Sequence, residues 1–144
     1  KNDVNINDHS IGIELENQGH EFGYTNFSKK QYDSLKSLIF FLKINFYILN
    51  ENILYHSDIA PNRKQDPGEK FFINRIGINR FNNKKIKRKL TTNEMLKLYG
   101  FHKSYVRKHK KFCIMAVKRT LNYTVINHSQ SKKFLKDFYN LIFS

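Results

Sequence analysis

The charged side chains of this chain are divided unequally between its two halves. Residues 1–72 hold 8 basic and 10 acidic side chains, whereas residues 73–144 hold 18 basic and 2 acidic ones. So abrupt a shift in composition indicates two structural units with a boundary near residues 74–90. The polar, basic run from Asn82 to Lys89 is the candidate connection. A length of 144 residues suits one ordinary domain or two very small ones.

The net charge of +14 has two explanations at this stage. A basic protein can bind nucleic acid or another polyanion. Alternatively, a low-GC genome enriches a chain in Lys, Asn, Ile, Phe and Tyr without selecting any such partner. A single cysteine excludes an internal disulfide framework and a zinc site built from cysteines alone. No apolar run is long enough for a membrane span, and no signal peptide is visible.

The first half of the chain predicts a strand, a helix and a second strand. Residues 11–16 alternate strictly between apolar and polar side chains, which is typical of a strand with one apolar face. Ser28 and Gln31 form a capping-box pattern, and an apolar stripe follows that predicts a helix over residues 29–46. Residues 52–55 form a short apolar run that predicts a buried strand. This order favours an α/β fold with a mixed β-sheet flanked by helices.

Residues 56–68 contain both prolines of the chain, which indicates a loop of defined geometry. The loop begins with His56, ends near Asp66 and includes Lys64 two residues before that carboxylate. Imidazole nitrogen and carboxylate oxygen are both zinc ligands. A lysine beside a metal can stabilise an oxyanion that develops on a substrate carbonyl. Spacing alone does not separate this hypothesis from an ordinary surface histidine and aspartate.

Two segments resemble one known family. The sequence HSDIAPNRKQDPG at residues 56–68 is similar to a motif of the zinc-dependent N-acetylmuramoyl-L-alanine amidases of the type 2 class, the AmiD- and AmpD-like enzymes. The sequence NDHSIGIELEN at residues 7–17 resembles the NDxSIGIELEN strand of the same family. Together the two motifs extend the resemblance over about residues 5–72, in the order that the family has.

The resemblance implies a role for four side chains. His56 and Asp66 match two zinc ligands, Lys64 matches a lysine that stabilises the tetrahedral intermediate, and Glu14 matches a strand glutamate that acts as the general base. The implied reaction is hydrolysis of the amide bond between N-acetylmuramic acid and L-alanine in peptidoglycan. Zinc lowers the pKa of its bound water to about 7 and polarises the scissile carbonyl. Glu14 would take the proton of that water, and Lys64 would stabilise the oxyanion.

The resemblance also implies a third zinc ligand, a histidine on a strand upstream of Ser10, for which the chain has no counterpart. Catalytic zinc sites usually have three protein ligands, and we do not expect His9 or His20 to substitute. We therefore expect an N-terminally truncated amidase whose own activity is open. The alternative is a catalytically inactive remnant that still binds peptidoglycan.

The second half predicts three short helices. Thr91 and Glu94 form a second capping box, with Gly100 as the C-terminal cap. A stripe at residues 112–116 predicts the next helix, and the last begins after Ser129 or Ser131. Around Leu98 and Ala116 the segment resembles the peptidoglycan-binding-like domain of AmiD-type enzymes. A nucleic-acid-binding module is the alternative, but Lys108, Lys110 and Lys111 are expected in a connection, so no helix shows a recognition face.

These expectations give three segments: an amidase domain over residues 1–80, a basic linker over residues 81–90, and a peptidoglycan-binding-like three-helix domain over residues 91–144. The expected partner is peptidoglycan or a muropeptide, with zinc as the cofactor and no nucleic acid. The resemblance implies a bacterial cell-envelope protein, periplasmic or secreted, and we expect a monomer.

Overall fold

A computed structural model of the chain describes residues 6–81 and 88–143. All regular elements within these ranges are helical. They are η1 (Ile6–His9), α1 (Gly19–Phe22), α2 (Lys29–Phe46), η2 (Asn50–Asn52), α3 (His56–Ile59), η3 (Ile73–Ile76), α4 (Thr92–Tyr99), α5 (Lys103–Thr120) and α6 (Lys132–Ile142).

Helix α2 confirms the prediction for residues 29–46, because its signals are local. The Ser28 side chain accepts a hydrogen bond from the Gln31 backbone amide at 3.2 Å, and the Gln31 side chain accepts one from the Ser28 amide at 2.8 Å. This reciprocal pair satisfies two of the amides that a helix start leaves without intrahelical partners. Tyr32, Leu35 and Ile39 bury the apolar face of the helix.

The predicted mixed β-sheet is wrong for the part of the chain that the structure describes, where no strand occurs. Residues 11–16 run as an irregular segment, and Ile11 and Ile13 of the expected buried face are 50% and 37% exposed. Alternation places apolar side chains on one face, but a strand also needs a neighbour for its backbone hydrogen bonds. No second described segment pairs with residues 11–16.

The second predicted strand, residues 52–55, is also wrong. Residues 50–52 form the turn η2, and the chain then continues without a regular element until α3 begins at His56. Tyr55 is buried, as expected of this run, but Leu54 is 48% exposed. An apolar run this short does not distinguish a strand from the extended entry to a helix. His56 thus opens a single helical turn instead of ending a strand.

The second half forms helices where their caps predict them. The Thr91–Glu94 capping box opens α4, Gly100 follows its end, and Ser131 caps α6. Helix α5 is longer than expected, since Lys108, Lys110 and Lys111 lie within it and not in a connection. Its φ and ψ leave helical values at His109, so a kink falls inside the lysine-rich stretch.

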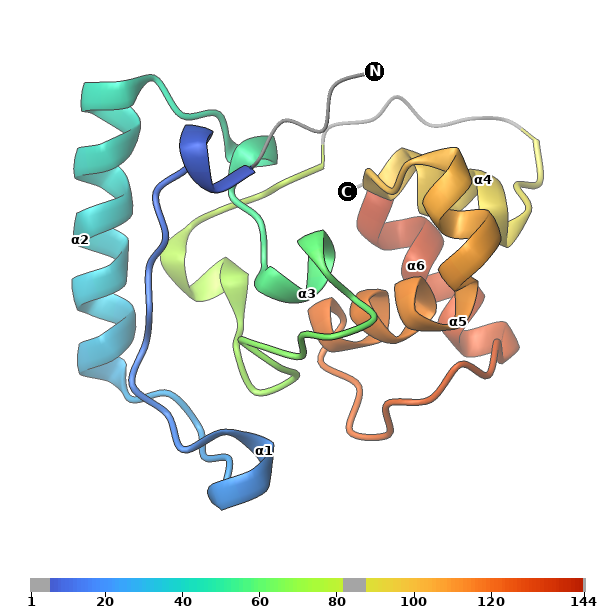
Figure 1. The fold of residues 1–144 in the computed structure, drawn as a ribbon, viewed down its shortest axis with the longest axis horizontal. Coiled ribbons are helices and arrows are strands. Elements are labelled where there is room, and N and C mark those ends of the chain that lie inside the picture. The colour runs from blue at the N-terminus through green and yellow to red at the C-terminus, as the bar shows by residue number, and fades with distance from the viewer. Residues whose placement is uncertain (1–5, 82–87, 144) are drawn as a thin grey trace.

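Two apolar cores form within the described residues. The first lies between α2 and η3 and is rich in stacked and edge-on aromatic rings, among them Phe27, Tyr32 and Phe71. The second lies among α4, α5 and α6, around Leu96, Phe134 and Phe138. Figure 1 shows α2 at one side of the molecule, α4 to α6 gathered at the other, and α3 between them.

The expected linker, residues 81–90, lies mostly outside the described residues, since 82–87 are not among them. Among the helices that are described, none is long and apolar enough to cross a membrane.

Phe138 gives a direct test of the second core, because its side chain is fully buried. We expect Phe138→Ala to lower the free energy of unfolding by about 3–5 kcal/mol, from lost transfer energy and the cavity left behind. Phe40→Ala is the matched control, since Phe40 is 67% exposed, and it should change stability by less than about 0.5 kcal/mol. Urea denaturation measures both variants, and equal losses would contradict the assigned core.

The start of α4 should depend on pH through Glu94. The Arg88 guanidinium, 2.7 Å away, and the Thr91 amide and hydroxyl lower the pKa of Glu94 to about 2. The stabilisation from this carboxylate is therefore complete above its ordinary pKa of 4.5 and is lost as pH falls through about 2. We expect the stability difference between wild type and Glu94→Gln to vanish over this interval. Thermal melts at stepped pH measure the difference, and a constant value would contradict the assignment.

Candidate functional site

The loop that follows α3 is closed on itself by a backbone hydrogen bond. The Ser57 amide donates to the Asp66 carbonyl at 3.1 Å, so the two ends of the loop lie together. This closure places His56 Nδ1 2.9 Å from Asp66 Oδ2. Both side chains remain accessible, with 38% and 55% of their surfaces exposed. Two potential metal-binding side chains, ten residues apart in sequence, are therefore adjacent at the surface.

The middle of the loop is a tight turn around Ala60. Its carbonyl accepts hydrogen bonds from the amides of Arg63 at 3.0 Å and Lys64 at 2.9 Å. Ala60 and Pro61 are buried beneath the turn, and the Lys64 side chain is half-buried. Lys64 is thus held by its backbone, two residues before Asp66, but no hydrogen bond or ion pair in the described residues joins its side chain to His56 or Asp66.

Glu14 is not brought to the His56–Asp66 pair by a direct contact. It is exposed within the irregular segment over residues 11–16, and no hydrogen bond or ion pair of the described residues involves its carboxylate. Of the four predicted site residues, the structure brings two into contact and leaves Glu14 and Lys64 separate from them.

Sequence reasoning missed the most constrained side chain of the segment, Asp58. Its Oδ2 accepts hydrogen bonds from the Tyr55 amide at 2.9 Å and from Arg80 Nη2 at 2.8 Å, and its Oδ1 accepts one from the Tyr99 hydroxyl at 2.6 Å. Burial raises the pKa of Tyr99 well above its ordinary value, and the Asp58 carboxylate raises it further. Tyr99 therefore stays protonated as a donor. No local pattern signals the contacts with Arg80 and Tyr99, because these partners lie 22 and 41 residues away.

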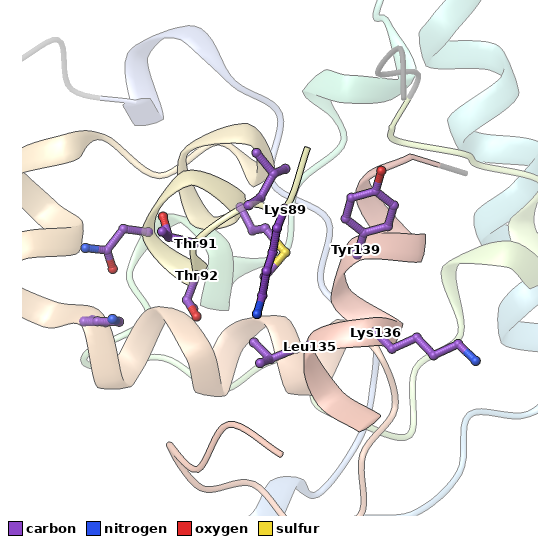
Figure 2. Close-up of a pocket in the computed structure, with 10 residues that line it drawn as sticks. Lys89, Thr91, Thr92, Leu135, Lys136 and Tyr139 are labelled. Carbon is purple, nitrogen blue, oxygen red and sulfur yellow. The ribbon is translucent and has the colours of Figure 1, made fainter. Parts of the chain in front are cut away.

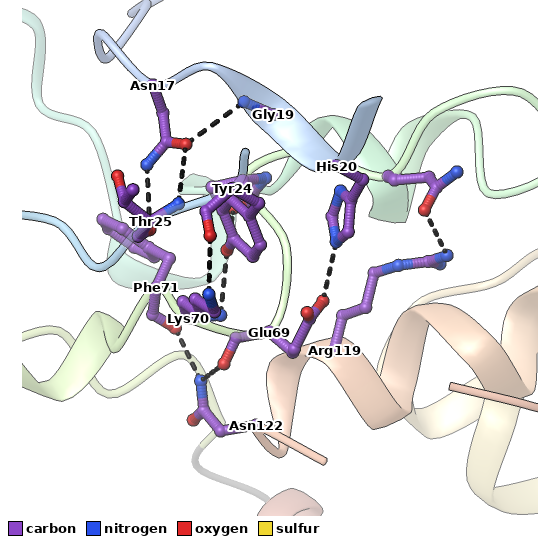
Figure 3. A network of polar contacts seen from close by, with 12 residues as sticks. Asn17, Gly19, His20, Tyr24, Thr25, Glu69, Lys70, Phe71, Arg119 and Asn122 are labelled. Atoms are coloured by element: carbon purple, nitrogen blue, oxygen red, sulfur yellow. Dashed lines mark hydrogen bonds and ion pairs between the residues drawn. The ribbon is translucent and has the colours of Figure 1, made fainter. Parts of the chain in front are cut away.

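The helices of the second half hold the loop at several further points, some of them drawn in Figure 3. The Tyr105 hydroxyl donates to Asn62 at 2.6 Å, and Arg119 Nη2 donates to Gln65 at 3.3 Å. The Asn122 side-chain amide donates to the carbonyls of Glu69 and Phe71, both at 2.7 Å. The loop is therefore in contact with both halves of the chain.

Tyr24 supports the loop from the other side (Figure 3). Its hydroxyl donates to the Pro67 carbonyl at 2.7 Å and accepts from the Lys70 amide at 2.8 Å. Burial raises its pKa to about 12. His20 stacks on Tyr24 with ring centroids 4.3 Å apart and contacts Glu69 through Nε2 at 3.0 Å. His20 is therefore engaged with Glu69 and not with the His56–Asp66 pair.

The side chains on the loop supply only part of a zinc site. His56 nitrogen and Asp66 oxygen are suitable ligands, but no cluster of three or more His, Cys, Asp or Glu side chains that could hold a metal occurs among the described residues. A catalytic zinc needs three protein ligands. The described residues therefore supply two donors and do not complete a zinc site by themselves.

Two hollows in the described surface lie away from this loop. One, of about 620 Å³, lies among α4, α5 and α6 (Figure 2). Its apolar wall includes Leu90, Met95 and Leu135, and Lys89, Lys110 and Lys136 also line it. None of its lining residues belongs to the loop at 56–68.

Gly68 tests how tightly the loop is packed. Its φ is +81°, and a Cβ at this position would lie 2.5 Å from the Tyr24 hydroxyl oxygen. We expect Gly68→Ala to lower stability by more than the ~1–2 kcal/mol that left-handed backbone strain alone costs.

Two other glycines separate the causes of that loss. Gly77 has a φ of +74° but open space at its Cβ, so Gly77→Ala should show the strain alone. Gly12 has open space and no positive φ, so Gly12→Ala should be close to neutral. Denaturant unfolding of the three variants measures the order, and equal losses at Gly68 and Gly77 would contradict the close packing on Tyr24.

Comparison with known proteins agrees with the resemblance seen in the two motifs. The family model for N-acetylmuramoyl-L-alanine amidase matches residues 2–69. N-acetylmuramoyl-L-alanine amidase AmiD of Escherichia coli K12 is 41% identical over 71 residues, which are 46% of this chain and 26% of that protein. 1,6-Anhydro-N-acetylmuramyl-L-alanine amidase AmpD of Enterobacter cloacae is 43% identical over 65 residues, 45% of this chain and 33% of that protein.

The chain thus spans about a quarter to a third of the length of these relatives. No solved structure gives a significant match. The family match contains both motifs and all four predicted site residues. Residues 2–69 are therefore similar to the N-acetylmuramoyl-L-alanine amidase family and to its members AmiD and AmpD.

Proposed function

We propose that this chain acts as an N-acetylmuramoyl-L-alanine amidase, which hydrolyses the amide bond between N-acetylmuramic acid and L-alanine in peptidoglycan. The observation that carries the proposal is the contact between His56 Nδ1 and Asp66 Oδ2 at 2.9 Å, within the segment that matches the amidase family. Two side chains of this chemistry, adjacent and accessible on a braced loop, are suited to holding a metal at the surface.

The proposed roles follow the family motifs. His56 and Asp66 would be two ligands of a zinc ion, which needs a third donor that the described residues do not supply. Lys64, whose amide is fixed by the Ala60 carbonyl at 2.9 Å, stabilises the negative charge that develops on the scissile carbonyl oxygen. Glu14 takes a proton from the attacking water. For Glu14, this role requires that the exposed segment over residues 11–16 approach the loop.

The domain organisation is also a proposal. Residues 1–80 form the amidase unit, residues 81–90 the basic linker, and residues 91–144 a peptidoglycan-binding-like unit. The separate apolar cores around Phe27 and Phe138 support this division. Activity on peptidoglycan places the protein in the bacterial cell envelope, in the periplasm or outside the cell, with peptidoglycan or a muropeptide as its partner.

Cleavage of a defined muropeptide tests the proposal. The full chain is incubated with zinc and a muramoyl peptide, and mass spectrometry follows the release of a free L-alanine amino terminus. We expect chelation to abolish release, and Asp66→Asn or His56→Gln to reduce it at least about 100-fold, because each removes one metal donor. His128→Gln is the matched control, since His128 is an exposed histidine outside the loop, and it should retain full activity.

Binding to purified sacculi separates the outcomes. Release of the peptide with a free L-alanine amino terminus that depends on Asp66 supports the amidase. Sedimentation with sacculi in the presence of chelator, without release, overturns the amidase in favour of a catalytically inactive peptidoglycan-binding remnant. Neither release nor sedimentation overturns both functions.

A further inference from the structure

We propose that the buried Asp58–Arg80 ion pair, together with the Tyr99 hydroxyl at the end of α4, is a positioning device that sets the geometry of the loop that carries His56 and Asp66. The inference rests on the proposed function, because it concerns the same loop. It assigns a role to Asp58, Arg80 and Tyr99, of which the last two lie beyond the family-matched segment.

The ion pair is buried on all sides. The Asp58 and Arg80 side chains are 5% and 3% exposed, with 2.8 Å between Asp58 Oδ2 and Arg80 Nη2. The other carboxylate oxygen accepts the Tyr99 hydroxyl hydrogen at 2.6 Å. Thr120 Oγ1 lies 2.7 Å from the Tyr99 hydroxyl and supplies the hydrogen of that contact, since the hydrogen of Tyr99 is directed at Asp58. One carboxylate thus connects α3 to Arg80, to the end of α4 and to the end of α5.

Arg80 has few alternatives to Asp58. Its Nε and Nη1 are buried and have no hydrogen-bond partner among the described residues. The rings of Tyr55, Phe81 and Tyr99 surround the guanidinium, with their centroids 5.2–5.4 Å from its central carbon. Aromatic faces attract a cation but do not replace an anion. If Asp58 moved away, a buried charge would be left uncompensated, which is strongly unfavourable. The aromatic surroundings of Arg80 therefore hold Asp58 in place.

The position of Asp58 directly affects the positions of His56 and Asp66. Asp58 and His56 lie in the same single helical turn, and Ser57 between them donates its amide hydrogen to the Asp66 carbonyl at 3.1 Å. The Asp58 carboxylate also accepts the Tyr55 amide at the start of that turn. A displacement of Asp58 therefore strains the Ser57–Asp66 hydrogen bond, which brings His56 and Asp66 together.

A purely structural ion pair would make a different prediction from a positioning device. Loss of a structural pair lowers the stability of the molecule as a whole, so amides that exchange through global unfolding exchange faster, while the loop gains no additional openings of its own. Loss of a positioning pair opens the loop selectively, because local openings cost less than global unfolding. The amide of Ser57 reports the loop, and the amide of Val117, fully buried in α5, reports global opening.

Native-state hydrogen exchange followed by NMR tests the proposal on the full chain. We expect Arg80→Met to increase the exchange rate of the Ser57 amide by at least about tenfold relative to that of Val117. Arg80→Lys keeps the charge and should restore most of the Ser57 protection. A Ser57-to-Val117 ratio that equals wild type in Arg80→Met would overturn the proposal.

If Arg80→Met does not fold, a pair of variants with smaller changes tests the same proposal. Tyr99→Phe removes the hydroxyl that contacts Asp58 and should raise the same ratio by a smaller factor, about threefold. Tyr123→Phe is the matched control, because it removes a tyrosine hydrogen bond of 2.7 Å to a carboxylate, that of Asp137, away from the loop. An equal ratio in both tyrosine variants would count against the proposal. The measurement needs no substrate or metal, so its outcome is independent of whether the chain proves to be an amidase.

Discussion

A carboxylate buried between the two halves of this chain is the interaction on which their arrangement depends. A charge inside a protein is tolerated only when it is paired and hydrogen-bonded, and Asp58 meets both conditions with Arg80, Tyr99 and the Tyr55 amide. The two apolar cores do not merge, and polar contacts of Asp58, Asn62 and Gln65 connect the loop to α4 and α5. These contacts are directional, and they fix the orientation of the loop more closely than an apolar interface would.

The sequence was sufficient wherever a signal lies within one helical turn of the residue that it affects. The Ser28 and Thr91 capping boxes and the Ser131 cap mark the starts of α2, α4 and α6, because cap and amide are three residues apart. His56 and Asp66 of the family motif are in contact, and the Ser57–Asp66 hydrogen bond explains why, while their role as zinc ligands stays a prediction. In the second half, the prediction that Lys108, Lys110 and Lys111 lie in a connection is wrong, because all three lie within α5. Lys108 and Lys111 are exposed on α5, whereas Lys110 is half-buried and lines the hollow among α4, α5 and α6.

The predicted strands failed for a different physical reason. A helix satisfies its backbone internally, whereas a strand depends on a second segment that its own sequence does not specify. The alternation at residues 11–16 therefore predicts which side chains share a face but not whether the face is covered, and Ile11 is half exposed. The contacts of Asp58 were equally out of reach, because nothing near residue 58 distinguishes Arg80 or Tyr99 from other arginines and tyrosines.

The basic excess of the second half also has a structural component. Arg80, Lys118 and Arg119 are buried, and each contacts a specific acceptor: Asp58, Asn127 with Ser129, and Gln65. Because these three charged side chains are buried, they cannot contribute to a surface that binds a polyanion. Two of them, Arg80 and Arg119, contact the segment matched to the amidase family from outside residues 2–69. The matched segment therefore does not contain the cation that neutralises its buried Asp58, because Arg80 lies after residue 69 in the chain.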